Sequence, residues 1–181
     1  MSNKKTLNLG CGKDIRKECI NMDIINLPGV DVVHDIEKLP LPFEAEEFDE
    51  IICMDILEHI EYTKTMKELH RILKKGGTLK IRVPHFTSRR NFNDPTHKKM
   101  FSIKTFQFFT GEETNERAYY FDYHFEAVTY SRIIFDKKPL LYNYIVEMVV
   151  NSSRRLKETI FESTFLSRLF PADLIRIDLK K

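Results

Sequence analysis

The sequence of 181 residues contains no apolar run of the roughly 18 residues or more that a membrane-spanning helix requires. Residues 1–5 are polar and run directly into an apolar segment at 6–9, which is not the pattern of a signal peptide. Cysteine is scarce as well, and Cys11, Cys19 and Cys53 match no zinc-binding spacing. The sequence therefore predicts a soluble cytoplasmic protein with reduced thiols, a disulfide being the alternative.

A large excess of charge is also lacking, since 29 Lys and Arg residues stand against 27 Asp and Glu residues, for a net charge of +2. A balance this close to neutral does not by itself indicate nucleic acid binding. Basic residues nevertheless gather at 89–99 and at Arg154 and Arg155. Each basic cluster is either a solvated face or a patch that recruits an anionic substrate.

Internal repeats, low-complexity tracts and interdomain linkers are absent from the sequence. Its 42% hydrophobic and 31% charged residues are typical of a globular protein, and its length is typical of one domain. We therefore expect a single domain over 1–181. Its two halves, 6–84 and 85–181, differ in their patterns.

The first half predicts alternating strands and turns or helices. Apolar positions at helical spacing predict a helix over 62–75, which Gly76-Gly77 would end. Short apolar segments predict strands at 6–9, 20–24, 31–34, 50–54 and 78–83. Strands and helices that alternate in this way indicate a parallel α/β sheet.

The second half predicts a short helix over 102–109, a strand over 125–135, a long helix over 141–161 and a strand over 172–179. We therefore expect an α/β fold with a doubly wound, mostly parallel sheet of about seven strands. Only 13–19 and 25–30 join the first three strands, whereas a parallel crossover usually needs about a dozen residues or more. The first two helices must therefore be reduced to a turn or two.

A Gly10-Cys11-Gly12 loop directly follows the first predicted strand. Glycine lets the backbone turn sharply and lets a ligand approach closely, although such a loop is often a plain turn. A dinucleotide fingerprint would require a third glycine where Ile15 stands, which counts against NAD or FAD.

Acidic residues end the next two predicted strands. A carboxylate at Asp23 can accept two hydrogen bonds from ribose hydroxyls. Asp35 can accept one from the exocyclic amine of adenine, while Ile36 packs against the ring. The alternative for each aspartate, taken alone, is a turn residue. Because open α/β sheets bind ligands at the carboxyl ends of their strands, these residues and the glycine loop together predict a ligand site there.

Four further motifs follow in order: LPLPF at 39–43, FDEII at 48–52, LEHI at 57–60 and LHRILKKGG at 69–77. This series resembles class I S-adenosylmethionine-dependent methyltransferases, in which LPF and FD precede the fourth strand, LEH opens the next helix and LKPGG precedes the fifth strand. The resemblance covers 6–84. The compact first half is similar to small "type 11-like" methyltransferase domains, often associated with cell-surface glycan or natural-product pathways.

The resemblance implies a Rossmann-like fold whose last strand lies antiparallel beside the fifth. It implies S-adenosylmethionine as the methyl donor, with S-adenosylhomocysteine as the product. Residues 6–84 would bind this cofactor, and the pocket for the methyl acceptor would be built from the second half.

The resemblance also implies roles for particular residues. Gly10 and Gly12 would face the methionine part of the cofactor, Asp23 the ribose, and Asp35 and Ile36 the adenine. The cofactor-binding residues so implied, with Met54 and Asp55 closing the site from the fourth strand, are Asn8, Gly10, Cys11, Gly12, Asp23, Ile24, Asp35, Ile36, Met54, Asp55 and His59.

Candidate catalytic residues lie beyond the fifth predicted strand, at His85, Asp94 and His97. Asp94 and His97 can orient each other as a base and its partner, unless Asp94 only begins a turn. A base is needed only where the acceptor carries a proton that must leave. We predict that the acceptor lies between His85, His97 and an aromatic run that can equally be core packing, formed by Tyr119, Tyr120, Phe121, Tyr123, His124 and Phe125.

A metal site is a further possibility at Asp55, Glu58 and His59, whose spacing puts them on one face of a helix start. Carboxylate and imidazole ligands can hold a divalent ion, and certain quinone-pathway O-methyltransferases resemble this stretch and use it for metal. Many relatives carry Leu-Glu-His without a metal. We therefore predict no metal and keep these three residues as candidates.

The sequence thus predicts methyl transfer to an oxygen or nitrogen of a small acceptor, glycan-like or natural-product-like. One alternative is nucleic-acid or protein methylation, with Arg89, Arg90, Lys98 and Lys99 as a docking patch. Against it, the Asn-Pro-Pro-aromatic tetrad of amino-methylating nucleic-acid enzymes is replaced by residues 54–57, Met-Asp-Ile-Leu. The other alternative is a cofactor-binding protein without catalysis. The acceptor and the oligomeric state stay open.

Overall fold

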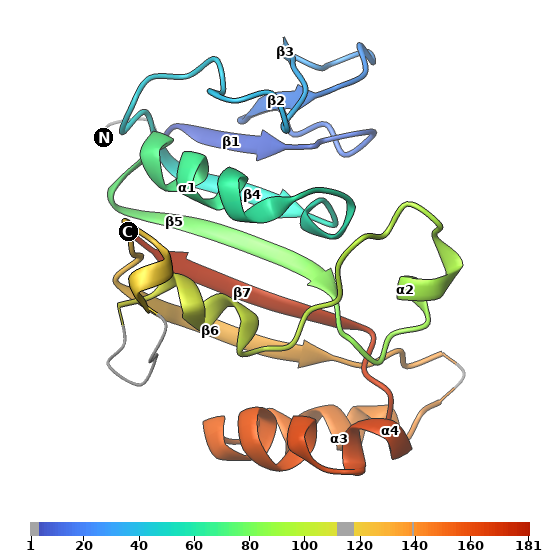
Figure 1. The fold of residues 1–181 in the computed structure, drawn as a ribbon. Helices are drawn as coiled ribbons and strands as arrows, with labels where there is room; N and C mark the ends of the chain where they lie inside the picture. The colour runs from blue at the N-terminus through green and yellow to red at the C-terminus, as the bar shows by residue number, and fades with distance from the viewer. Residues whose placement is uncertain (1–3, 112–117, 139) are drawn as a thin grey trace.

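The computed structural model describes residues 4–111, 118–138 and 140–181. At its centre is a seven-stranded sheet with the strand order β3-β2-β1-β4-β5-β7-β6 (Figure 1). The strands are β1 (Thr6–Leu9), β2 (Ile20–Asp23), β3 (Val32–Val33), β4 (Phe48–Met54), β5 (Leu73–Pro84), β6 (Ala127–Ile134) and β7 (Leu174–Lys180).

The strand directions confirm the predicted fold class. Strands β1 to β5 pair in parallel, whereas β7 is antiparallel to both of its neighbours, β5 and β6. Six strands therefore share one direction, and the last strand of the chain opposes them from beside the fifth. This is a Rossmann-like, mostly parallel sheet.

Helices are few and short in the described part of the chain. Helix α1 lies across the central strands, and α3 and α4 lie together beyond β6 (Figure 1). None of these helices combines the length and the apolar character needed to cross a membrane. They are η1 (Leu57–His59), α1 (Tyr62–Ile72), α2 (Arg90–Asn93), η2 (Thr105–Phe109), η3 (Ala118–Tyr120), α3 (Asn143–Val150), η4 (Leu156–Phe161) and α4 (Leu166–Leu169).

The first two crossovers contain turns and no helix, as the short spacing predicted. In place of helices, hydrogen bonds of the buried residue Asn21 hold these crossovers against the sheet. Its Oδ1 accepts hydrogen bonds from Asn8 Nδ2 and from the Arg16 backbone N–H, both at 3.0 Å. Its own backbone N–H donates to Asp31 Oδ2 at 2.8 Å. One side chain on β2 thus ties both crossovers to the sheet.

The predicted end of the helix over 62–75 is wrong. Helix α1 ends at Ile72, and Leu73 already belongs to β5, where it pairs with Phe48. Gly77 does not end the helix but accepts a hydrogen bond from the backbone N–H of Lys181 at 3.0 Å. Gly76 and Gly77 therefore belong to β5, because they pair with Lys181 at the far end of the chain. No local sequence pattern reveals this pairing.

The predicted long helix over 141–161 is divided into α3 and η4. Asn151 causes the break, since its side chain accepts from the Ile133 backbone N–H at 2.9 Å and donates to the Ile133 carbonyl at 2.8 Å. These bonds tie the end of α3 to β6. The strand predicted over 6–9 has the predicted ends, and the other predicted elements are present with shifted ends.

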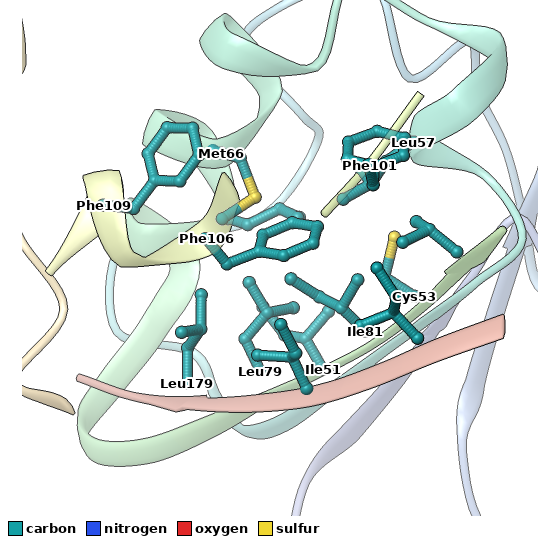
Figure 2. Packing of buried hydrophobic residues seen from close by; sticks show 14 of the residues in the cluster. Ile51, Cys53, Leu57, Met66, Leu79, Ile81, Phe101, Phe106, Phe109 and Leu179 are labelled. Atoms are coloured by element: carbon teal, nitrogen blue, oxygen red, sulfur yellow. The ribbon is translucent and has the colours of Figure 1, made fainter. Parts of the chain in front are cut away.

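The core lies between the sheet and the segment that follows β5. Figure 2 shows Phe106 over Ile51, Leu79 and Ile81, with Met66 of α1 beside it. The rings of Phe101 and Phe106 stack with centroids 5.6 Å apart and planes 9° apart, and both side chains are completely buried. This aromatic layer fixes the segment after β5 on the sheet.

We expect Phe106→Ala to lower the free energy of unfolding by about 3–5 kcal/mol, because it removes a fully buried ring and leaves a cavity. The matched control is Phe92→Ala, whose ring is 73% exposed; its effect should stay within about 0.5 kcal/mol. Urea denaturation followed by circular dichroism measures both. Equal losses in the two variants would contradict this account of the core.

Candidate functional site

Two adjoining cavities lie at the carboxyl ends of the parallel strands. The first cavity has a volume of about 300 Å³ and lies against the ends of β1 and β2 and the residues after β3. The second cavity, of about 570 Å³, lies between η1, the end of β5 and the 90–97 segment. His59 lines both cavities, so the two cavities share one wall residue.

The first cavity collects a large part of the predicted cofactor set. The predicted residues that line it are Gly10, Asp23, Ile24, Asp35, Ile36 and His59. Sequence reasoning missed four lining residues of note: His34, Glu37, Ile56 and Ile60. Their positions in the sequence, beside Asp35-Ile36 and around the Leu-Glu-His motif, could have indicated that they line the cavity. Their residue types could not.

The carboxylate of Asp23 is held in place by backbone groups of two turns. Its Oδ2 accepts the Gly12 N–H at 2.7 Å, and its Oδ1 accepts the Ile25 N–H at 3.0 Å. Each oxygen keeps a further lone pair for a ligand. The structure thus presents an oriented acceptor at the first cavity.

Gly10 is required by its backbone and by its neighbour. Its φ of +62° lies in the left-handed region, and a Cβ there would lie 2.2 Å from Ile56 Cδ1. Gly12 also has a positive φ, +49°, but a Cβ there would meet no atom within 4 Å. The close contact between the glycine loop and Ile56 therefore shapes the wall of the first cavity.

Five predicted cofactor residues do not line the first cavity: Asn8, Cys11, Gly12, Met54 and Asp55. Asn8 is buried and donates to Asn21 and to the Asp14 carbonyl, and Cys11 is buried with its N–H on the Met22 carbonyl. Gly12 contributes its N–H to Asp23 instead. Met54 lines a separate cavity on the other side of β4, with Glu50. These residues shape the strand ends but do not line the cavity.

Asp55 lines the second cavity and not the first. It has a φ of +57° and forms a two-pronged ion pair with Arg82, in which Nε donates to Oδ1 at 3.0 Å and Nη2 donates to Oδ2. Because both of its oxygens already have a cationic partner, this carboxylate is the least available of the three metal candidates.

Glu58, His59 and His97 converge on the second cavity, with one ligand-type atom from each lying within 4.8 Å of the others. Glu58 is only 1% exposed, and burial raises its pKa to about 8. Within the described chain, Glu58 Oε2 and His97 Nδ1 are buried atoms without a hydrogen-bond partner. The structure therefore groups His97 with two of the three candidates named from sequence.

A chain of hydrogen bonds orients His59. The Thr96 hydroxyl donates to Asp94 Oδ1 at 2.6 Å, and Thr96 Oγ1 lies 2.8 Å from His59 Nδ1. Since the hydroxyl proton is used on Asp94, its oxygen accepts from His59 Nδ1–H, which leaves Nε2 with a free lone pair. The bonds from Thr96 also hold the pKa of Asp94 below its ordinary value. His97 Nε2 is farther from Asp94, at 3.8 Å.

The comparisons with known proteins agree with this architecture. Residues 7–81 match a family model described as a methyltransferase domain. An S-adenosylmethionine-dependent methyltransferase from Archaeoglobus fulgidus has the same fold, with a TM-score of 0.61 and 18% identity over 98% of this chain and 86% of that one. The chain is thus similar to a methyltransferase domain over 7–81, and it has the fold of an S-adenosylmethionine-dependent methyltransferase.

Two curated proteins are similar to part of this chain. An uncharacterized protein of Methanocaldococcus jannaschii is 40% identical over 73 residues, 38% of this chain and 32% of that protein. The ubiquinone biosynthesis O-methyltransferase of Pseudomonas aeruginosa is 27% identical over 99 residues, 42% of this chain and 43% of that protein. The chain spans less than half the length of either relative.

The structure does not bring His85 to either cavity. The side chain is completely buried, with Nδ1 2.7 Å from Thr87 Oγ1 and Nε2 3.1 Å from Glu162 Oε1. It lines neither cavity. With both ring nitrogens bonded inside the protein, His85 connects the end of β5 to η4 and its flanking residues and is not placed to act as a base.

The aromatic run at 119–125 is also away from the two cavities. Tyr123 and Phe125 are buried and pack around His70 of α1, with ring centroids 5.3 and 5.1 Å from the imidazole. Tyr119 and Tyr120 are exposed. The core-packing interpretation of this segment therefore holds for Tyr123 and Phe125, and no part of it walls the second cavity.

We expect Gly10→Ala to destabilise the protein more than the matched change Gly12→Ala. Both place a side chain in left-handed backbone, which costs about 1–2 kcal/mol, but only Gly10→Ala also adds an atom against Ile56. Urea denaturation of both variants provides the comparison. If Gly12→Ala were as costly as Gly10→Ala, the contact with Ile56 would not constrain the loop.

Proposed function

We propose that this chain transfers a methyl group from S-adenosylmethionine to an oxygen or nitrogen atom of a small acceptor. The observation that carries the proposal is the pair of cavities joined at His59. A cofactor in the first cavity has its sulfonium directed toward the second, from which an acceptor can approach in line. Holding the two reactants in this alignment supplies much of the rate of a displacement at carbon.

Cofactor recognition is assigned to the first half of the chain, 6–84. In this proposal Asp23 accepts the ribose hydroxyls, and Asp35 accepts the adenine amine. Ile24 and Ile36 provide apolar contacts to the rings. The support for Asp23 is its fixed carboxylate, because an acceptor that is already oriented loses little entropy when a ligand binds.

In the proposed reaction, a lone pair of the acceptor atom attacks the methyl carbon and forms the new bond. The bond between sulfur and the methyl carbon breaks, and its electron pair returns to sulfur, which gives neutral S-adenosylhomocysteine. Where the acceptor atom carries a proton, Asp94 and His97 at the second cavity are the groups proposed to receive or direct it. His85 has no part in this step.

The pairing of the basic patch with carboxylates of the protein favours a small acceptor over nucleic acid or protein. Each of its four cations lies within 4.0 Å of a carboxylate. These pairs are Arg89 with Asp136, Arg90 with Asp173, Lys98 with Glu37 and Lys99 with Glu61. A patch neutralised within the protein attracts phosphates weakly.

Calorimetric titration with S-adenosylmethionine and with S-adenosylhomocysteine tests the cofactor proposal. We expect Asp23→Ala to weaken both ligands by about tenfold or more, equivalent to about 1.4 kcal/mol. The matched control is Asp14→Ala, which removes a neighbouring exposed carboxylate that pairs with Arg16 and lines neither cavity. This variant should retain most of the affinity.

The absence of heat with either ligand, from folded wild-type protein, would contradict the proposal. Equal weakening by Asp14→Ala would mean that the loss at Asp23 reflects a disturbed loop or lost negative charge and not a contact with the ligand. Cofactor affinity with no turnover on any hydroxyl or amine acceptor would favour a binding protein without catalysis.

A further inference from the structure

The cluster of Glu58, His59 and His97 has the arrangement of a ligand set. Two of its members come from η1, and the third comes from the turn that precedes 98–99. The backbone N–H of Lys98 donates to the Glu58 carbonyl at 2.7 Å, which holds that turn against η1. The rings of His59 and His97 are nearly perpendicular, with centroids 4.6 Å apart. The backbone contact between this turn and η1 therefore holds the three side chains close together.

Two polar atoms of this cluster also lack a hydrogen-bond partner among the described residues. Glu58 Oε2 and His97 Nδ1 lie buried without any hydrogen-bond partner in the described chain. Leaving a buried polar atom unpaired costs about 1–3 kcal/mol. Both residues line the cavity of about 570 Å³, and a cation bound between them would give such atoms a partner.

Neighbouring residues also orient His59 so that it can bind a cation. The hydrogen-bond chain from Asp94 through Thr96 fixes the proton on Nδ1 and leaves the Nε2 lone pair free. Metal-binding histidines are typically oriented in this way, by a partner on the nitrogen that does not bind the metal. Asp55 is excluded from the set, because Arg82 occupies its carboxylate.

We propose that Glu58, His59 and His97 bind a divalent first-row transition-metal ion at the acceptor end of the site. Two imidazoles and one carboxylate suit Mn²⁺, Fe²⁺, Co²⁺ or Zn²⁺, whereas Mg²⁺ and Ca²⁺ prefer oxygen ligands throughout. Bonds of about 2.0–2.2 Å keep ligand atoms within about 4.4 Å of one another. The present separation of up to 4.8 Å closes with a small side-chain adjustment.

The role of the ion, unlike its binding, rests on the proposed function. Three protein ligands leave coordination positions open toward the second cavity, where a hydroxyl oxygen of the acceptor can bind. Coordination lowers the pKa of that hydroxyl. Its proton then passes to water or to Asp94, because His97 is a metal ligand when the ion is bound and no longer receives it. The oxygen then bonds to the methyl carbon while the carbon–sulfur bond breaks. The metal thus selects an acceptor with a hydroxyl group over one with only an amine.

The test is a titration of Co²⁺ into untagged, EDTA-treated protein, followed by calorimetry and by the visible absorption of the bound ion. We expect about one ion per chain and a spectrum typical of nitrogen and oxygen ligands. Glu58→Gln and His97→Gln, which nearly preserve side-chain size, should each weaken binding by about tenfold or more. His70→Gln is the matched control, since His70 lies on α1 and lines neither cavity.

The proposal is overturned if folded wild-type protein binds no Co²⁺, or if both cluster variants bind it as tightly as His70→Gln does. Excess Mg²⁺ should leave the Co²⁺ spectrum unchanged, and displacement by Mg²⁺ would overturn the assignment to a transition metal. Titration of the same metal-free samples with S-adenosylmethionine separates the two proposals. Cofactor binding without Co²⁺ binding refutes the metal site alone, and Co²⁺ binding without cofactor binding refutes the proposed function alone.

Discussion

The hydrogen bonds of Asn21 are the constraint on which the first cavity depends. Crossovers of this length cannot form helices that pack on the sheet, so the strand ends need another anchor. The buried Asn21 side chain provides it by bonding to Asn8 and Arg16, while its backbone N–H bonds to Asp31. Two residues farther along, Asp23 bonds to Gly12 and Ile25. The same short strand thus holds both turns and presents the carboxylate that faces the cavity.

Where structure follows from neighbours in sequence, the sequence predicted it well. The strands of the first half, their parallel order and the six residues from Gly10 to His59 that gather at one cavity depend on short-range patterns that repeat at each strand end. Asn8 and Met54 show the limit of this reasoning. A residue at a strand end can point along the sheet, into the loop or to the opposite face, and residue type alone does not distinguish these directions.

The second cavity was harder to predict because distant segments build it. His85 and His97 are equally plausible in sequence, yet Glu162 and Thr87 engage His85 inside the protein, while the bond from Lys98 to Glu58 turns His97 toward η1. The partner of Gly77 at Lys181 ends α1 early in the same way. In each case the deciding contact joins residues far apart in the chain, and no local periodicity encodes it.

The two cavities therefore depend on different parts of the chain. The first is built almost entirely from 9–60, whose fold is held by Asn21 and by the contact of Gly10 with Ile56. The second takes Pro84 and the residues from Arg90 to His97, which form a short segment outside the sheet. His59 is the structural link between them. Substitutions within 90–97 can thus alter which acceptor fits the second cavity while leaving the first cavity intact. His59 limits which substitutions are tolerated, because it lines both cavities.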